Sequence, residues 1–251
     1  MFTVKRENDQ PLQLKKVNEY GEYIPFPGVT VISACYPEQK EFCETIYKAL
    51  VKNPSLLNYF APLPADSYHM TTMSLETEQQ IGSDWTQFIN DNLSRYKNMN
   101  QVLQKKPIYP SIERMEVRIG WSISLTLHLP QQQIIHIKET AESLNIEKTI
   151  PKVFHMTLAY SIPNTQIPEE LKIDITKELN TVIGNTQLPI KIAQPTLCYF
   201  HDMTSFPVWD AEKNPFTQTS FSSHRLFSFI SDETNKATAS SEKILENTLA
   251  H

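Results

Sequence analysis

Two short segments of the sequence share residue types that can move a proton beside an anion. One is Tyr-His-Met-Thr at residues 68–71 and the other is Phe-His-Met-Thr at residues 154–157. In an extended strand, residues two apart point to the same face, so each His is expected to project beside its Thr. An imidazole next to a hydroxyl can transfer a proton while the hydroxyl holds an anion. Two such units facing each other would place an acid and a base across a phosphate.

The repetition of the full triplet is the informative observation. A bare His-x-Thr is expected by chance roughly 0.6 times in a chain of this composition, whereas His-Met-Thr is expected only about 0.02 times. We therefore take His69 and His155 as candidate catalytic residues, with Thr71 and Thr157 beside them. The simpler interpretation, two core strands that each bury a hydrogen-bonded His, stays open.

The composition bounds the class of protein. With 251 residues, 40% hydrophobic and 20% charged, the chain can fold as one large domain or two lobes. A net charge of −5 argues against general binding of duplex DNA, although it permits a small basic pocket. Only 5 Gly accompany 17 Pro, and no Gly-rich phosphate loop occurs, which disfavours nucleoside-triphosphate and dinucleotide folds of those kinds.

The expected location is the cytoplasm. The three Cys form no Cys-x-x-Cys pair, as is typical of free thiols in a reducing compartment. The first residues have no apolar core of a secretory signal, and no apolar run reaches membrane-spanning length. We expect a monomer without membrane contact.

The order of expected elements is that of a duplicated α+β fold. Each His segment is expected on a strand that follows a strand and a helix, in equivalent places of two similar halves. We expect an N-terminal arm at 1–24, a bilobal domain at 25–210, and a C-terminal extension at 211–251 that packs on the domain and ends in a partly flexible tail. Aromatic residues after His201, among them Phe206, Trp209 and Phe216, are expected to pack back on a lobe.

The clearest periodic signal runs from Met115 to Leu129. Apolar and polar residues alternate there, which predicts one long strand or two strands joined at Gly120, with Trp121 on the apolar face. Arg118 falls on the polar face and is our candidate for the cation that a phosphate site needs. An ordinary solvated sheet face is the alternative, and the favoured one for His128.

Two His-x-Thr motifs in a repeated strand–helix order resemble the 2H phosphoesterase superfamily, which includes RNA 2′-5′ ligase-like proteins and cyclic phosphodiesterases. The segment at 25–30 (Pro-Phe-Pro-Gly-Val-Thr) and the segment at 154–160 look most like its DUF1868 branch. The resemblance covers roughly residues 20–210.

That resemblance implies two antiparallel sheets around a concave cleft lined by His69, Thr71, His155 and Thr157. It also implies catalysis without metal or cofactor, in which one His is the general base, the other is the general acid, and the Thr hydroxyls hold phosphate oxygens. The implied substrate is a 2′,3′-cyclic phosphate, a 2′-5′ linkage or a related nucleotide or RNA-end phosphodiester. Which His is the acid stays open.

One residue departs from the family pattern, in which the residue after Thr is usually apolar. Leu158 fits this pattern and Thr72 fits it less well, which makes the first motif the less typical one. Aromatic side chains are expected at the cleft rim to stack on a base, and Phe26, Tyr160 and Tyr199 are the candidates for substrate binding. Taken singly, a packing role is the favoured interpretation of each of them.

Three other interpretations stay open. The cleft could bind a nucleotide or RNA end without turning it over. The two His could ligate a metal with a third, although neither His-x-x-x-His nor His-Glu-x-x-His occurs. The chain could also be an interaction scaffold with a decayed site.

Overall fold

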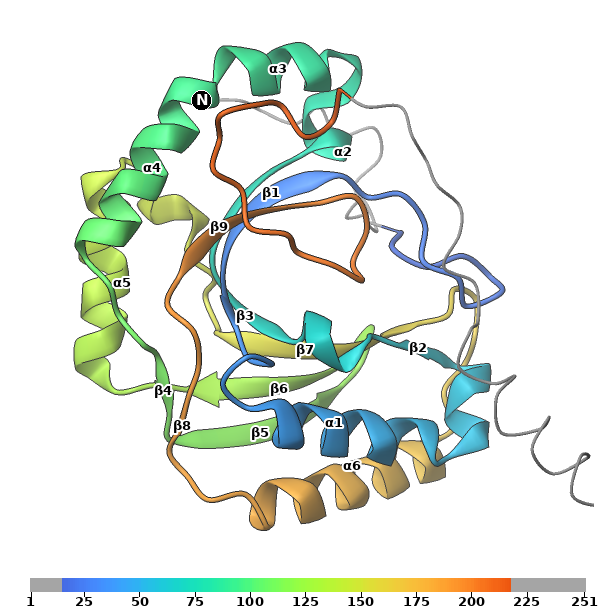
Figure 1. Ribbon diagram of the computed structural model, residues 1–251. Helices are drawn as coiled ribbons and strands as arrows, with labels where there is room; N and C mark the ends of the chain where they lie inside the picture. The colour runs from blue at the N-terminus through green and yellow to red at the C-terminus, as the bar shows by residue number, and fades with distance from the viewer. Residues whose placement is uncertain (1–14, 218–251) are drawn as a thin grey trace, which may run out of the picture. The chain divides into compact units, whose positions relative to one another are not determined.

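The computed structural model of this protein describes residues 15–217, which form an α+β fold around two antiparallel sheets (Figure 1). One sheet has the strand order β3-β1-β9, another has the order β2-β7-β6-β5, and a short one pairs β4 with β8. The strands are β1 Gly28–Ala34, β2 Phe60–Pro62, β3 His69–Thr77, β4 Ser111–Ile112, β5 Arg114–Ile119, β6 Ser122–His128, β7 His155–Ser161, β8 Ile190–Lys191 and β9 Thr196–Phe200.

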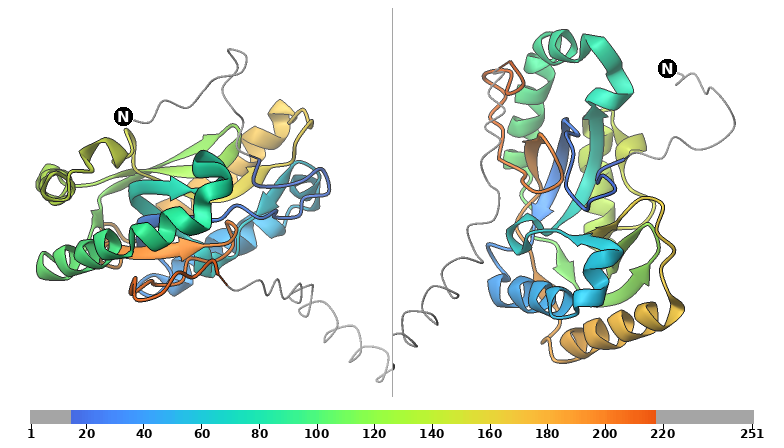
Figure 2. Two further views of the ribbon diagram at one scale, coloured as in Figure 1. Left: turned by 90° about the horizontal axis from the view of Figure 1, so that it is seen from above. Right: turned by 90° about the vertical axis from the view of Figure 1, so that its right-hand side faces the viewer.

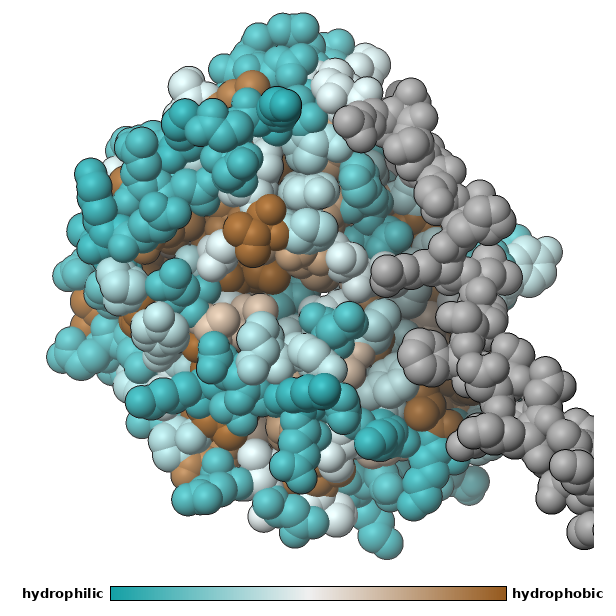
Figure 3. Space-filling model, in the orientation of Figure 1, coloured by the Kyte–Doolittle hydropathy of each residue, from teal (hydrophilic) through white to brown (hydrophobic). Residues whose placement is uncertain are grey.

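Helices cover the outer sides of this framework. They are α1 Lys40–Val51, α2 Glu78–Ile81, α3 Trp85–Asp91, α4 Leu93–Lys105, α5 Gln131–Ser143 and α6 Glu169–Gly184, with short 3-10 turns at Pro54–Asn58, Ala65–Ser67, Gly82–Asp84 and Glu147–Thr149. α1 and α6 lie side by side (Figures 1 and 2), and α6 contacts β5 while α4 contacts β9. In the view of Figure 3, hydrophilic residues dominate over the helices, and hydrophobic residues gather near the middle of the face.

The predicted fold class is confirmed, but the duplication is not. A strand–helix–strand unit does recur: β1 and β3 flank α1 and pair antiparallel, as β6 and β7 do around α5. The halves differ beyond that unit. β9, the last strand in the sequence, pairs with β1 in the first sheet, whereas β2 pairs with β7 at the edge of the second sheet. Each His strand therefore lies next to the first strand of its unit, within sheets of unequal size.

The alternating stretch forms two strands joined at Gly120, the second of the two predicted arrangements. β5 and β6 pair through Met115 with Leu127 and Ile119 with Ile123, which places the apolar set on one face. Trp121 departs from the prediction. It lies at the tip of the hairpin, beyond the edge of the core, and 77% of it is exposed.

The close pairing of β1 with β9 depends on Gly28. A Cβ on this residue would lie 2.3 Å from Cζ of Phe200, whose ring is buried. A side chain at position 28 would therefore displace that ring. Since Phe200 packs against Phe206 with ring centroids 5.3 Å apart, the displacement would reach the segment that follows β9.

Residues 15–24 pack onto the domain through a turn. Val17 is buried and bridges to Tyr23, while the side chain of Asn18 accepts hydrogen bonds from the backbone of Tyr20 and Glu22. The glycine in this turn, Gly21, has a φ of 81°, which an L side chain rarely adopts. The first part of the predicted arm, residues 1–14, lies outside the described residues, as do residues 218–251 of the predicted C-terminal extension. The predicted domain boundaries stay predictions.

Within residues 15–217, no helix is long and apolar enough to cross a membrane.

Candidate active site

Both predicted histidines occupy the same position in their strands. His69 is the first residue of β3 and His155 is the first residue of β7. The aromatic residue before each of them is buried, Tyr68 completely and Phe154 with 8% exposed. The backbone carbonyl of each aromatic residue also accepts a hydrogen bond of 2.9 Å, that of Tyr68 from Cys35 directly after β1 and that of Phe154 from Leu127 on β6. The matched aromatic residues of the two motifs therefore anchor the start of each strand and direct the following His outward.

The two imidazoles are also held in the same orientation. Nδ1 of His69 lies 2.7 Å from the carbonyl oxygen of Ser67, and Nδ1 of His155 lies 3.2 Å from that of Val153. A carbonyl oxygen only accepts, so each Nδ1 carries the proton that is donated. In the neutral ring, Nε2 is then the unprotonated nitrogen. Both motifs therefore present a free Nε2 that can accept a proton.

The two motifs meet in one cavity of about 310 Å³. His69 and Thr71 contribute from β3, and His155 and Thr157 contribute from β7, which contacts β3. None of the described residues that line this cavity is Asp or Glu. The lining residues are Lys16, Phe26, Val29, Thr30, Leu63, His69, Thr71, Ser74, Leu75, Thr77, Gln80, Pro151, His155, Thr157, Tyr160, Phe200, Met203 and Phe206.

The surroundings of His69 disfavour its charged form. The ring centroid of Phe206 lies 4.2 Å from that of the imidazole, which is partly buried, whereas His155 is exposed. This burial is the main reason why the pKa of His69 is lowered to about 4, and the positive charges of Lys16 and of protonated His155 lower it further. The hydrogen bond to Ser67 acts in the opposite direction. His69 is therefore neutral at pH 7, as a general base must be.

The hydroxyl that departs from the family pattern has a structural role. Thr72 is fully buried, in the position that Leu158 takes in the second motif, and its Oγ1 donates a hydrogen bond of 3.1 Å to the carbonyl of Val31. A buried hydroxyl that is hydrogen-bonded costs little. The first motif therefore tolerates Thr at this core position without changing the faces of His69 and Thr71.

The other predicted site residues divide into two groups. Phe26 and Tyr160 line the cavity, but Tyr199 and Arg118 do not. Side chains alternate along β9, so Tyr199 points away from Phe200 and packs instead on neighbouring aromatic rings. Arg118 lies on β5, two strands from β7, where its exposed side chain pairs with a glutamate on its own strand.

Among the lining residues that the sequence did not indicate, Lys16 and Phe206 matter most, because both lie close to His69. Lys16 falls in the predicted N-terminal arm, because a turn of this kind is recognisable only once Val17 and Tyr23 are known to bridge. The signal in the sequence is the pair Asn18 and Gly21, residue types that favour a tight turn. Phe206 was correctly expected to pack back on the domain, but nothing in its spacing indicates contact with His69.

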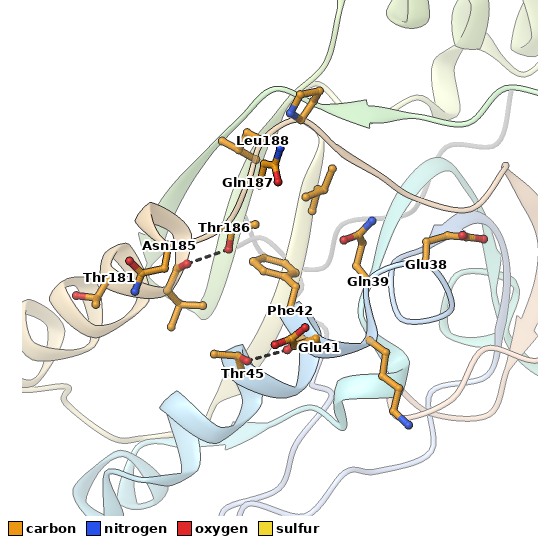
Figure 4. A pocket seen from close by; sticks show the side chains of 14 residues that line it. Glu38, Gln39, Glu41, Phe42, Thr45, Thr181, Asn185, Thr186, Gln187 and Leu188 are labelled. Carbon is orange, nitrogen blue, oxygen red and sulfur yellow. Dashed lines mark hydrogen bonds between the residues drawn. The ribbon is translucent and has the colours of Figure 1, made fainter.

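The structure has other hollows without paired histidines. One of them, about 760 Å³, lies between the start of α1 and the end of α6 with the segment that follows it (Figure 4). Its lining includes Glu38, Lys40 and Glu41. The hydroxyls of Thr45 and Thr186, also in Figure 4, each donate a hydrogen bond to the backbone carbonyl four residues earlier in the chain. Among residues 15–217, no three His, Cys, Asp or Glu side chains are grouped so as to hold a metal ion.

Two antiparallel sheets bring the paired His-x-Thr strands of this protein to one cavity. Residues 16–119 match the family model of 2H phosphodiesterases described as domain of unknown function DUF1868. This match confirms the resemblance to the superfamily and to its DUF1868 branch. The matched stretch includes the first motif and ends before the second.

A solved structure shares the fold. The conserved protein of unknown function ATU0111 from Agrobacterium tumefaciens superimposes with a TM-score of 0.60 at 18% sequence identity, over 80% of this chain and 93% of that chain. Among curated proteins, none matches this chain.

Proposed function

We propose that this protein is a metal-independent phosphodiesterase that uses His69 and His155 as a general base and a general acid. Its substrate would be a 2′,3′-cyclic phosphate, a 2′-5′ linkage or a related nucleotide or RNA-end phosphodiester. The observation that carries the proposal is the convergence of both imidazoles and both motif hydroxyls on one cavity without carboxylates among its described lining residues. Such a cavity favours an anion over a cation.

In the hydrolytic direction, a water molecule attacks the phosphorus of a cyclic phosphate. Nε2 of His69 takes a proton from the water, and a new bond forms between phosphorus and the water oxygen. The bond between phosphorus and one ribose oxygen breaks, and His155 gives its proton to that oxygen. The low pKa of His69 supports its role as the base, because an imidazole must be neutral to accept a proton.

The hydroxyls of Thr71 and Thr157 would donate hydrogen bonds to the non-bridging phosphate oxygens. Negative charge builds on these oxygens as the new bond forms, and fixed donors aimed at such charge stabilise the transition state. Each Thr lies two residues after its His on the same strand, so both hydroxyls lie on the cavity side of their sheets.

The test compares the wild type with His69→Ala and His155→Ala on a 2′,3′-cyclic mononucleotide in the presence of EDTA. We expect turnover by the wild type and a loss of about 10²- to 10⁴-fold in kcat/KM in each variant. His128→Ala is the matched control, because His128 lies on the same sheet face but outside the cavity, paired with Glu116.

Three outcomes would contradict the proposal. Activity that needs an added divalent metal would remove its metal independence. An equal loss in the control variant would show that the effect is not local to the cavity. Binding of the nucleotide without turnover of any of the three substrate types would favour the alternative, a non-catalytic nucleotide or RNA-end binding protein.

A further inference from the structure

Apart from the histidines, Lys16 is the only described residue lining the cavity whose side chain carries a formal charge. It comes from outside both motifs, on the turn that precedes β1. We propose that Lys16 is an anion-binding residue of this cavity and that its ammonium binds a non-bridging oxygen of the substrate phosphate. The identity of the anion as a substrate phosphate rests on the proposed function, whereas the anion site itself does not.

The ammonium of Lys16 is held in place by its neighbours. Its Nζ donates a hydrogen bond of 3.1 Å to the hydroxyl of Tyr160. It also lies over the rings of Tyr160 and Phe26, at 4.7 and 5.2 Å from their centroids. Contacts of this kind between a cation and aromatic faces are worth about 0.5 to 2 kcal/mol. Lys16 is therefore a positioned charge and not a freely moving surface lysine.

The aromatic partners of Lys16 are themselves fixed. Tyr160 donates its own proton to the sulfur of Met203, at 3.4 Å, which leaves the tyrosine oxygen to accept from Lys16. Tyr23 packs edge-on against the ring of Tyr160 and donates to the carbonyl of Ala61 at 2.7 Å. The backbone carbonyl of Lys16 accepts from Ile24 across the turn. The position of the ammonium is thus determined by both the turn and β7.

The charge of Lys16 lacks an acidic partner among the described residues. An ammonium has three donors, and the hydrogen bond to Tyr160 uses one of them. No carboxylate of residues 15–217 pairs with it, although Lys16 is only partly exposed. A partly buried charge is costly unless it is paired. Lys16 lines a cavity in which none of the described residues is a carboxylate, so an anion there would supply the missing partner.

Lys16 also acts on the neighbouring imidazole. Its positive charge is one of the causes that lower the pKa of His69, which requires the two groups to be close. An anion bound between them would offset part of this repulsion. Lys16 therefore occupies the role for which the sequence suggested Arg118, but from inside the cavity.

The alternative is that the lysine only covers two aromatic rings while its charge stays in solvent. The methylene groups of a Lys side chain commonly pack on apolar surface while its ammonium stays in water. In that case the affinity for an anion would not depend on the charge. Lys16→Met separates the two possibilities, because methionine keeps an unbranched stem over the rings and removes the charge.

The experiment is a titration with inorganic phosphate, followed calorimetrically and by the NMR signals of the His69 ring, which requires no turnover. We expect Lys16→Met to weaken phosphate binding by about tenfold or more, the usual effect of losing one charge-assisted hydrogen bond, and the pKa of His69 to rise. Lys16→Arg should retain most of the affinity. Lys15→Met is the matched control, because Lys15 is an exposed lysine next in the chain that does not line the cavity.

The possible results separate the proposed anion site from the proposed function. Equal phosphate affinity of Lys16→Met and the wild type, or no phosphate binding by the wild type, overturns the proposal, as does an equal loss in the Lys15→Met control. Lys16-dependent phosphate binding by a wild type that hydrolyses no phosphodiester would leave the anion site standing and refute the proposed function instead. Lys16-dependent binding together with turnover supports both.

Discussion

Phe206 packs against His69, and its removal tests whether burial sets the protonation of this imidazole. The phenylalanine ring lies 4.2 Å from the imidazole and excludes water from one side of it. Burial is the largest cause of the lowered pKa of His69. In Phe206→Ala, water reaches the ring, charged imidazole is better solvated, and the pKa of His69 rises from about 4 toward its ordinary value of 6.5.

The size of the effect follows from these two values. At pH 5, an imidazole with a pKa of about 4 is about 90% neutral, whereas one with a pKa of 6.5 is about 3% neutral. A variant that recovers half of the difference would be about 36% neutral. Because only neutral His69 can act as the base, kcat/KM at pH 5 relative to its maximum should fall at least about twofold in Phe206→Ala.

The assay measures kcat/KM for a 2′,3′-cyclic mononucleotide between pH 4 and 9 and, separately, the NMR titration of His69. Phe206→Leu is the control, because leucine keeps an apolar cover over the imidazole and should keep the acidic limb nearly unchanged. A His69 titration midpoint that stays at its wild-type value in Phe206→Ala would refute the reasoning, whatever happens to turnover.

The same shift predicts how stability depends on pH. The unfolded chain binds a proton at His69 below about pH 6.5, whereas the folded protein does so only below about pH 4. Between these values the unfolded state holds more protons, so acid favours unfolding. The contribution of His69 is therefore fully present above pH 6.5 and is lost as the pH falls to 4, and Phe206→Ala should flatten this slope in urea titrations.

Three further substitutions test the architecture around the site. Arg118→Ala should leave KM for a cyclic mononucleotide within about twofold and raise KM for an oligonucleotide that ends in a cyclic phosphate. The reason is that Arg118 lies outside the cavity but on the same sheet face. Equal effects on both substrates would contradict this. Gly28→Ala should cost about 1 to 3 kcal/mol in urea unfolding, because the new Cβ meets the buried ring of Phe200; an unchanged midpoint would show that the ring moves freely. Glu76→Ala should cost about 1 to 3 kcal/mol in the same assay, because it leaves the fully buried Tyr96 without its hydrogen-bond acceptor, whereas Glu76→Gln should lose less.

The paired motifs and the strand faces could be predicted from the sequence because they depend on local period. Alternation along a strand fixes which residues share a face, and this places each His beside its Thr in both motifs. The hairpin centred on Gly120 follows from the same alternation. The exposure of Trp121 does not follow, because alternation describes the direction of a side chain and not where the core ends.

The rest of the site depends on contacts between distant segments. Lys16 reaches the cavity through a turn whose bridge from Val17 to Tyr23 is visible only in the folded chain. Tyr199 falls outside the cavity because β9 pairs with β1 in a register that turns Phe200 toward it. Register between strands far apart in sequence is set by packing and not by local propensity.

The matched backbone contacts of His69 and His155 have a consequence for successive turnovers. Since Nδ1 of each ring is committed to a carbonyl, both rings exchange protons through Nε2 alone. In the proposed reaction His69 ends each cycle with a proton and His155 ends it without one, the reverse of the starting condition. Before the next turnover, a proton must therefore pass from the shielded ring of His69 to the exposed ring of His155 through solvent or a buffer molecule. A rate that rises with buffer concentration at constant pH would be the signature of this recovery step.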